Sequence, residues 1–544
     1  MFRRFALLLI APLIAGAVTQ PAPVVGGVAN AASNLAAGLP ASGIAQGSIF
    51  TVYGSNLGPA SPCFASTVPY SATLCGVSLT VTVNGTSSFP LPTFVYPTQI
   101  NAILPSLTPT GNSGTITVTY NGQTSATFPI TVVTAAFGEF TPAYGAGQAS
   151  VTDVNYNLNT IIHTLHPGDI GILWGTGLGP ITGSDAEPPT TFPNIGTPTV
   201  YVGNTAETGT SSGLLYAGRS GSWPGLDQIN FTVPQGVQGC YVPIAVQAGG
   251  VVGNMGTIAV APAGQNTCSD APMGQTLVNK LASGGNVNFG YVRLESINLT
   301  FVGLITAGHG NGDYAYASFS GFTPQTAYTA EYGVSAGYCI SGQYNLDDLS
   351  AQNLDAGPAL TLAGPLVAPP IPQAYPGSGY YGAALSSAGK FLYSDEHYVM
   401  TGTGGANVGA FTATDTSSIP NVKLTPIAGK TFPRSSNLTV TWTGGDPTLQ
   451  NGQVILGGAS FNADETLAVE FECTVPLAPG QFTIPSWVLQ SLPVTGAITQ
   501  GSVTSPNGYI WIGQYNNPTT FTAPGLDLGI MTDIFFQGDG VYFN

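Results

Sequence analysis

Short stretches in which apolar and polar residues alternate recur along the sequence, and several end at a tight-turn signal. Residues 79–83 read LTVTV before Asn84-Gly85, and residues 116–120 read ITVTY before Asn121-Gly122. Residues 438–442, LTVTW, repeat the pattern near the other end of the chain. Alternation with a period of two turns one row of side chains to a core and the other to solvent, and Asn-Gly supplies the positive φ angles of a hairpin. The pattern predicts half-buried antiparallel strands and an all-β chain.

Glycine and proline exclude most helical alternatives. The 544 residues include 73 Gly and 43 Pro, which interrupt nearly every window in which helical periodicity can develop. Only 6% of the residues are charged, so a helical bundle or coiled coil with ion-paired faces is excluded. The formal net charge of −16 repels the phosphates of nucleic acids and anionic lipids, and no nucleic-acid partner is expected. We therefore expect a series of β-sandwiches.

The N-terminus has the pattern of a secretory signal peptide. Arg3 and Arg4 precede the apolar run 5–14, and the small residues 15–17, AGA, follow it. The run is shorter than the roughly 20 residues that span a bilayer, and no later segment stays apolar for that length. The sequence predicts a signal peptide over residues 1–17, no transmembrane segment after its removal, and a protein that is secreted or retained at the cell surface.

The cysteines are consistent with export, because thiols tend to oxidise outside the cytosol. Their spacing predicts two disulfides, Cys63 with Cys75 and Cys240 with Cys268. The remaining pair, Cys339 and Cys473, is left open. Because Cys473 alternates with apolar residues on one strand face, a buried free thiol is the favoured interpretation there.

One segment of the chain is duplicated. Residues 47–59, GSIFTVYGSNLGP, recur as residues 168–180, GDIGILWGTGLGP, and six of the thirteen positions are identical. Further along, the tripeptide QIN at 99–101 returns at 228–230. In each copy a strand ends at a glycine-rich turn, where glycine adopts backbone angles closed to other residues. The repeat predicts two related domains in tandem.

These motifs also carry a family resemblance. Residues 26–59, VTVNG at 81–85, FVYPTQINAILP at 94–105 and the second GTGLGP at 175–180 resemble an uncharacterised tandem immunoglobulin-like (IPT/TIG-like) module of secreted Solibacter-type acidobacterial proteins. The resemblance extends over about residues 26–262. It implies serial immunoglobulin-like β-sandwich domains and export, and it provides no catalytic residues to carry over. The chain departs from the module at residues 163–169, HTLHPGD.

Composition separates the two halves of the chain. Residues 1–269 contain 7 of the 25 acidic residues, and the other 18 follow. We expect a boundary near Cys268 and a linker at residues 414–420. The predicted division is a signal peptide at 1–17, the first immunoglobulin-like repeat at 18–140, the second at 141–269, a β-rich domain at 270–415 and a C-terminal β-sandwich at 416–544.

Residues suited to catalysis or metal binding are scarce. The chain has four histidines, and His163 and His166 lack a nearby third ligand, so a solvated loop is favoured over a zinc site. Two acidic groups have oxygen ligands of the kind that Ca²⁺ prefers: Asp347, Asp348 and Asp355, and Asp464, Glu465, Glu470 and Glu472. Neither has the spacing of a dedicated loop, and a solvated strand edge is the favoured reading of Glu470 and Glu472. No metal, cofactor or catalytic residue is predicted.

Aromatic residues offer the best candidates for binding. Trp174 occupies the repeat position of Tyr53, inside a strand, which favours core packing for its side chain. Trp223 lies in a loop with Arg219 shortly before it and Asp227 shortly after it. Loops at the ends of immunoglobulin-like sandwiches carry binding sites, so Trp223, Arg219 and Asp227 form the candidate binding loop.

These features together favour a secreted or cell-surface, non-enzymatic structural or adhesive protein. The partners expected of such a protein are extracellular polysaccharide or cell-surface components. The alternative is a carbohydrate-binding extracellular protein that uses a C-terminal domain, and an exported hydrolase ranks third.

Overall fold

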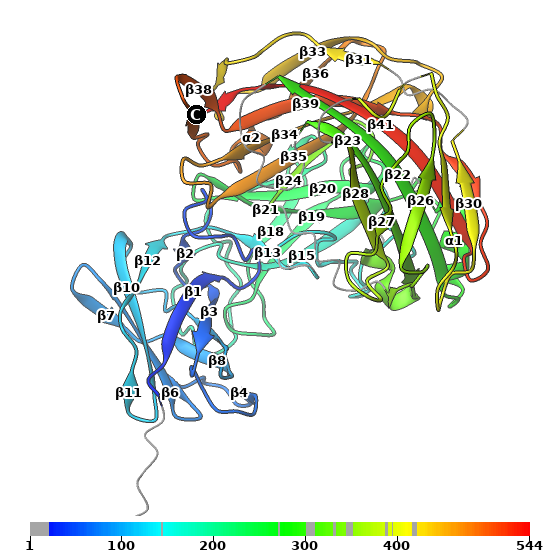
Figure 1. The fold of residues 1–544 in the computed structure, drawn as a ribbon. Coiled ribbons are helices and arrows are strands. Elements are labelled where there is room, and N and C mark those ends of the chain that lie inside the picture. Colours follow the sequence, from blue (N-terminus) through cyan, green and yellow to red (C-terminus); the bar gives the residue numbers. More distant parts are fainter. Residues whose placement is uncertain are drawn as a thin grey trace, which may run out of the picture.

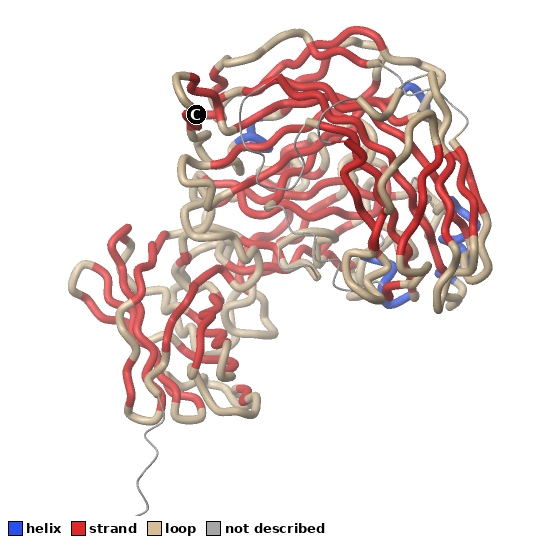
Figure 2. Tube along the Cα trace, in the orientation of Figure 1, coloured by secondary structure: helices blue, strands red, loops and turns tan. Residues whose placement is uncertain are grey.

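The computed structural model describes residues 21–142, 145–269, 273–300, 311–329, 333–343, 352–386, 390–393, 395–415 and 421–544. The predicted signal peptide, Asp347 and Asp348 lie outside this part of the chain. The described residues are nearly all in strands and turns (Figures 1 and 2), and the all-β prediction is confirmed. Their α-helices are α1 (Gly274–Ala282) and α2 (Ser486–Leu489), and no described helix has the length and apolar character needed to cross a membrane.

The first repeat is a β-sandwich of two sheets whose strands are mostly antiparallel. One sheet has the order β1 (Val24–Asn30), β3 (Ile49–Ser55), β9 (Gln99–Ile103), β8 (Leu91–Val95) and β4 (Cys63–Phe64). The other has the order β2 (Ile44–Ala45), β12 (Phe128–Val133), β10 (Gly111–Tyr120), β6 (Val77–Val83) and β5 (Thr73–Leu74), with β7 (Thr86–Ser88) and β11 (Gln123–Thr124) at its margins. The alternating residues Leu79, Val81 and Val83 are buried in the core between the sheets, and Asn84 makes the hairpin turn at a φ of 51°, as the sequence predicts.

The second repeat folds as another sandwich with the same strand pairing. Its first sheet has the order β13 (Gly138–Glu139), β15 (Ile170–Thr176), β19 (Asp227–Thr232) and β18 (Leu214–Arg219), and β14 (Val151–Thr152) pairs with β15. Its second sheet has the order β17 (Thr205–Glu207), β16 (Thr199–Val202), β20 (Gly239–Ala248) and β21 (Val251–Val260). Trp174 lies opposite Gln228, as Tyr53 lies opposite Gln99 in the first repeat, so the two copies share their register.

The C-terminal half is organised by a ten-stranded sheet that crosses the predicted boundary at residues 415 and 416. Its order is β24 (Tyr338–Gly342), β35 (Ala468–Pro476), β34 (Gln453–Phe461), β39 (Gly508–Tyr515), β41 (Leu528–Gly540), β22 (Val287–Thr300), β23 (Gly312–Phe322) and β25 (Gln352–Asn353), with β28 (Tyr380–Ser386) and β40 (Thr519–Phe521) paired to it. Strands β22 and β41, from either side of the predicted boundary, pair in parallel along most of their length. The two predicted C-terminal domains therefore share one sheet.

Smaller sheets cover the apolar face of this large sheet. One consists of β27 (Ile371–Pro372), β26 (Ala359–Ala363), β29 (Val399–Gly402) and β30 (Phe411–Thr414), and it packs against β22 and β23. Another consists of β31 (Val422–Leu424), β33 (Leu438–Gly444) and β36 (Gln481–Ile484). Leu438, Val440 and Trp442 on β33 are buried against β34, β35 and α2, so the alternation at 438–442 also identifies a half-buried strand correctly.

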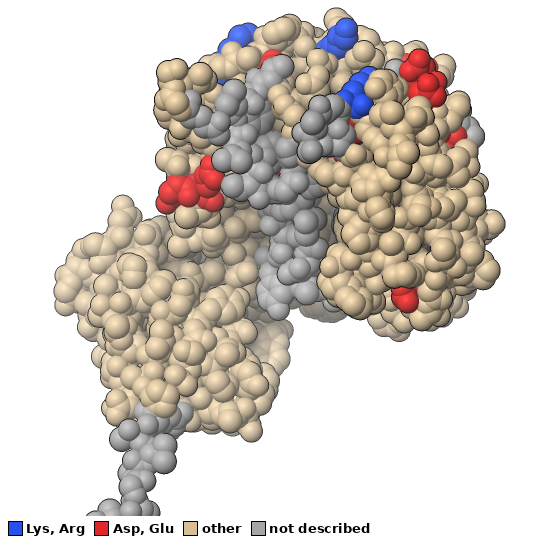
Figure 3. Space-filling view, viewed as in Figure 1, with Lys and Arg blue, Asp and Glu red and all other residues tan. Residues whose placement is uncertain are grey.

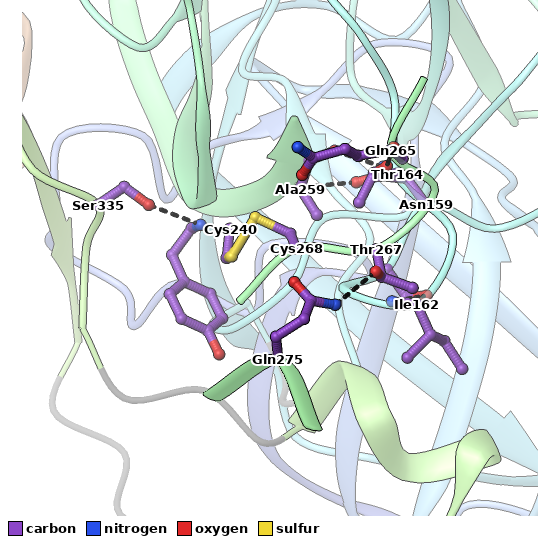
Figure 4. The surroundings of a disulfide bond; sticks show 12 residues. Asn159, Ile162, Thr164, Cys240, Ala259, Gln265, Thr267, Cys268, Gln275 and Ser335 are labelled. Atoms are coloured by element: carbon purple, nitrogen blue, oxygen red, sulfur yellow. Dashed lines mark hydrogen bonds between the residues drawn. A yellow bond between two sulfur atoms is a disulfide. The ribbon is translucent and has the colours of Figure 1, made fainter. Parts of the chain in front are cut away.

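The described residues form three disulfide bonds. The two pairs predicted by spacing are formed: Cys63–Cys75 closes a loop within the first sandwich, and Cys240–Cys268 joins β20 to the segment before α1 (Figure 4). Cys339 and Cys473 are also joined, instead of forming the buried free thiol that we favoured. The reason is their register, because β24 and β35 are neighbours and place these two residues directly opposite each other.

Candidate functional surfaces

The candidate binding loop contains a buried ion pair. Arg219 ends β18 and Asp227 begins β19, and the two are cross-strand partners with exposures of 3% and 0%. The guanidinium of Arg219 forms an ion pair with Asp227 and donates to the carbonyl of Gly179 at 3.1 Å. The Asp227 carboxylate also accepts the backbone N–H groups of Gly177 and Leu178, at 2.7 and 2.8 Å. The buried pair therefore fixes the glycine-rich turn of the second repeat through hydrogen bonds to its backbone.

Burial dominates the electrostatics of this pair. Desolvation raises the pKa of Asp227 above its ordinary value, while the charge of Arg219 and the two backbone donors oppose that rise. Trp223, in contrast, is 60% exposed on the loop between the two strands. The structure thus brings Arg219 and Asp227 together in the interior, where a ligand does not reach them, and separates them from Trp223. Among the three predicted binding residues, only Trp223 faces solvent.

The same ion pair lies at the junction of the two repeats. Gly47 of the first repeat packs so closely on the Arg219 guanidinium that a Cβ at Gly47 would collide with it. Nearby, Thr176 Oγ1 accepts the N–H of Ile49 at 2.8 Å and donates to the carbonyl of Gly225 at 2.7 Å. The sequence does not predict the contact between Gly47 and the Arg219–Asp227 pair, because these residues belong to different repeats.

A second set of contacts fixes the other side of this junction. The carboxylate of Asp185 accepts both the backbone N–H and the hydroxyl of Ser106, each at 2.7 Å. Asn30 donates its side-chain amide to the carbonyls of Ala136 and Thr176, at 3.2 and 3.1 Å. The backbone N–H of Ala136 donates to the carbonyl of Gly177 at 3.0 Å, so the segment that connects the two sandwiches is hydrogen-bonded to both of them.

The histidines of the unusual segment do not converge on a metal site. His166 hydrogen-bonds Asp169 at 2.8 Å and the carbonyl of Gln265 at 2.9 Å, while His163 contacts Asp153 at 3.3 Å. Within the described ranges, no group of three or more histidine, cysteine, aspartate or glutamate side chains is placed to hold a metal ion. The local role of this segment is to pair its imidazoles with nearby carboxylates and a carbonyl.

Trp174 is not a core residue, which corrects the interpretation of its repeat position. In β15 the residues that face the core are Gly171, Leu173 and Gly175, and Trp174 lies half-buried on the opposite, outer face. The ring of Trp174 stacks on Tyr156, which is 68% exposed, with 6.3 Å between ring centroids. Tyr53 lies at the same outer position in the first repeat. Each repeat therefore presents an aromatic ring on the outside of its sheet.

The ten-stranded sheet has a polar face with several ionisable groups. Arg293 on β22 pairs with Glu295 at 2.9 Å, and its guanidinium lies 5.5 Å from the centre of the Tyr316 ring. On β35, Glu470 and Glu472 lie on this same side, and Tyr509 donates to Glu470 at 3.3 Å. The prediction of a solvated strand edge for these glutamates is wrong, because β35 is an interior strand between β24 and β34.

Burial shifts the ionisation of both glutamates. Desolvation, together with the neighbouring charge of Glu472, raises the pKa of Glu470 to about 7, against the effect of the Tyr509 hydrogen bond. Desolvation also raises the pKa of Glu472, and the charge of Arg293 opposes that rise. At neutral pH this face therefore has carboxyl groups that hold protons more tightly than ordinary glutamates do.

The stability of the C-terminal half should depend on the ionisation of Glu470. Its folded pKa of about 7 exceeds the ordinary 4.5, so ionisation costs folding free energy as the pH rises from about 4.5 through 7. We expect the unfolding free energy of the wild-type chain to fall by about 1 to 2 kcal/mol more than that of Glu470→Gln between pH 5 and pH 8, because glutamine cannot ionise. Urea denaturation at both pH values measures this difference.

The matched control is Glu187→Gln, which removes a carboxylate from an exposed loop of the second repeat. This control should follow the pH dependence of the wild type. Identical pH slopes for Glu470→Gln and wild type would contradict the assignment.

No protein-family model and no curated protein matches the chain. Matching solved structures include three N-terminal domains of the outer capsid protein Hoc of bacteriophage RB49 (8% identity, 73% of this chain and 99% of that chain, TM-score 0.14) and domains 4–9 of the surface layer protein SbsC (12%, 93% and 83%, 0.17). Extracellular domains 3–5 of Drosophila OTK match at 8% identity over 73% and 98%, with a TM-score of 0.11. Scores this low carry no argument about function, and the resemblance of residues 26–262 to the Solibacter-type module stays a prediction.

Proposed function

We propose that this chain is an exported or cell-surface structural protein that holds its domains, and whatever they contact, at fixed separations without catalysing a reaction. The observation that carries the proposal is the junction between the two repeats, built on the buried pair Arg219–Asp227. A flexible tether would be rich in exposed glycine and serine and free of such contacts. Three disulfides support export, because they persist in oxidising compartments.

The second repeat also packs directly against the C-terminal half. The rings of Tyr201 and Trp487 stack with 5.0 Å between their centroids and planes that differ by 13°. Asn204 donates to the carbonyl of Gly337 at 2.8 Å, and Met255 belongs to the same apolar core as Cys339. Figure 1 shows the resulting arrangement, in which the first sandwich projects from a body formed by the other two parts. Rigidity of this extent suits a spacer.

A distance measurement tests the proposed rigidity. Leu107 in the first sandwich is 92% exposed and Val367 in the C-terminal half is 98% exposed, so spin labels at these positions disturb no packing. With labels attached through non-cysteine chemistry, we expect one narrow distance distribution from pulsed electron resonance. A broad distribution would overturn the structural proposal, and immunogold labelling of intact cells tests its location.

One observation favours a second candidate function, hydrolysis of an extracellular polymer. The polar face of the ten-stranded sheet places Glu470, with a pKa of about 7, close enough to Glu472 for their charges to interact. A carboxyl group that remains partly protonated near neutral pH is suited to act as a general acid. Turnover of a polysaccharide by the purified chain that Glu470→Gln abolishes would replace the structural proposal with this one.

A further inference from the structure

The two repeats present the same set of side-chain types, namely an aromatic ring, a glutamine and an asparagine, on the outer face of the equivalent strand pair. In the first repeat these are Tyr53 on β3 with Gln99 and Asn101 on β9, and in the second they are Trp174 on β15 with Gln228 and Asn230 on β19. Ile100 and Ile229, which separate the amides, face the core with 0% exposure. The duplicated QIN tripeptide therefore places its two amides outward beside an aromatic ring. We call each set an aromatic–amide face.

The amides of both faces are held in the same orientation. Gln99 Nε2 donates to Asn101 Oδ1 at 2.9 Å, and Gln228 Nε2 donates to Asn230 Oδ1 at 2.8 Å. This contact uses one donor of the glutamine and one acceptor of the asparagine. The glutamine oxygen and the asparagine NH₂ remain, and all four side chains are half-exposed. Each repeat thus offers an acceptor and donors at fixed positions.

Further aromatic rings extend each face. In the first repeat, Phe94 lies opposite Asn101, and Phe64, which is 66% exposed, lies 5.0 Å from Phe94 between ring centroids. In the second repeat, Tyr216 takes the position of Phe94 opposite Asn230, and Tyr156 stacks on Trp174. Rings and amides therefore alternate across a surface several strands wide.

Neither face has an exposed basic side chain, since Arg219 is the only lysine or arginine between residues 18 and 269 and it is buried. The sequence between Val18 and Gly138 contains no lysine, arginine, aspartate or glutamate, so the first repeat up to Glu139 is uncharged. Figure 3 shows this contrast on one side of the molecule, where the coloured charged groups lie on the C-terminal half. In the second repeat, Arg219 and Asp227 at the ends of the same strands are buried and paired. The carboxylate of Asp153 is partly exposed in the turn that carries Tyr156, so an anionic polymer finds no counter-charge on either face.

We propose that each aromatic–amide face binds a neutral polysaccharide, one site in each repeat. Sugar rings present apolar C–H faces that pack on aromatic rings and hydroxyl groups that exchange hydrogen bonds with fixed amides. The absence of an exposed basic side chain from both faces leaves a polyanion without ion-pair partners and favours a polymer that is itself uncharged. This assignment goes beyond the structural role and does not depend on it, because a flexible chain with the same faces would also bind.

The rigid junction adds an affinity effect. Two sites held at a fixed separation bind one long polymer with an affinity that exceeds either site alone by as much as about 10²- to 10⁴-fold when the polymer reaches both. A short oligosaccharide that fills one site gains nothing from the second. The ratio of polymer to oligosaccharide affinity therefore reports whether both faces act together.

Affinity gel electrophoresis of the full mature chain tests the site. The gels contain neutral probes, namely β-1,3-glucan, mannan, dextran and hydroxyethyl cellulose, or the polyanion alginate. We expect at least one neutral polymer to retard the protein and alginate to have no effect. Tyr53→Ala or Trp174→Ala should weaken retardation at least about tenfold, and more where one polymer spans both faces, and the double variant should abolish it. No retardation by any neutral polymer, or retardation by alginate alone, would overturn the proposal.

Two controls separate binding from folding and from the loop. Tyr53→Phe keeps the ring and should bind as the wild type does, and the thermal unfolding of every variant is measured beside its mobility. Trp223→Ala removes an exposed tryptophan that lies outside both faces and should leave retardation unchanged. If Trp223→Ala abolishes binding while Tyr53→Ala with Trp174→Ala does not, the site lies on the loop and the assignment to the faces is wrong.

Discussion

Arg219→Ala is expected to destabilise the two repeats by about 3 to 5 kcal/mol, because it leaves the Asp227 carboxylate buried without its partner. Asp227 is fully buried, and burial already raises its pKa, so the loss of Arg219 should raise that pKa further. The hydrogen bond to Gly179 is lost as well, and with it one restraint on the turn at the repeat junction. Chemical denaturation of the purified protein, followed by tryptophan fluorescence, measures the change.

A matched control comes from the exposed ion pair of Lys280 with Asp527. Its side chains are 42% and 27% exposed, and Lys280→Ala should cost less than about 1 kcal/mol. Replacing Arg219 by Met and Asp227 by Asn together should recover part of the lost stability, since no unpaired charge then remains and the Asn carbonyl can still accept the N–H groups of Gly177 and Leu178. A cost below about 1 kcal/mol for Arg219→Ala would show that the pair does not hold the junction.

The second large effect is expected from removing the disulfide between Cys339 and Cys473. The two residues are 134 positions apart, and closing a loop of that length restricts the unfolded chain by about 5 kcal/mol. Double replacement by alanine should therefore lower the unfolding free energy of the C-terminal half by about 4 to 5 kcal/mol. Both residues are fully buried, so reduction under native conditions should be slow.

The disulfide between Cys63 and Cys75 provides the comparison. It spans 12 positions, and its double alanine variant should cost about 3 kcal/mol on the same argument. Peptide mapping of the purified protein without reductant checks that both bonds form. Alkylated Cys339 and Cys473 in that map, or equal costs for the two double variants, would contradict the prediction.

The strands were the most predictable part of the fold. At residues 79–83 and 438–442, alternation identifies both the strand and its buried row, because a period of two is local information. The shared sheet of the C-terminal half was not predictable in this way. Strand β22 pairs with β41 across more than 230 residues of sequence, and no local pattern specifies which distant strand becomes a neighbour.

Trp174 shows why a candidate site can be missed. Alternation in β15 suggests a core row that contains the large side chains, yet the core row holds Gly171 and Gly175. A Cβ at Gly171 would strike the ring of Phe231, and one at Gly175 would strike Phe137, so these glycines make room for rings from other strands. The row of β15 that faces the core is therefore the one that contains the two glycines, and Trp174 lies on the outer face of the sheet.

The uncharged first repeat has a consequence for how the molecule meets its surroundings. With no lysine, arginine, aspartate or glutamate between Val18 and Gly138, that end has no ionised side chain below about pH 9 and generates only a weak long-range field. The acidic remainder is repelled from a negatively charged envelope over about one Debye length, whereas the neutral end is not. The protein should therefore approach such a surface with its neutral end first. Repulsion of the acidic end turns the molecule into that orientation.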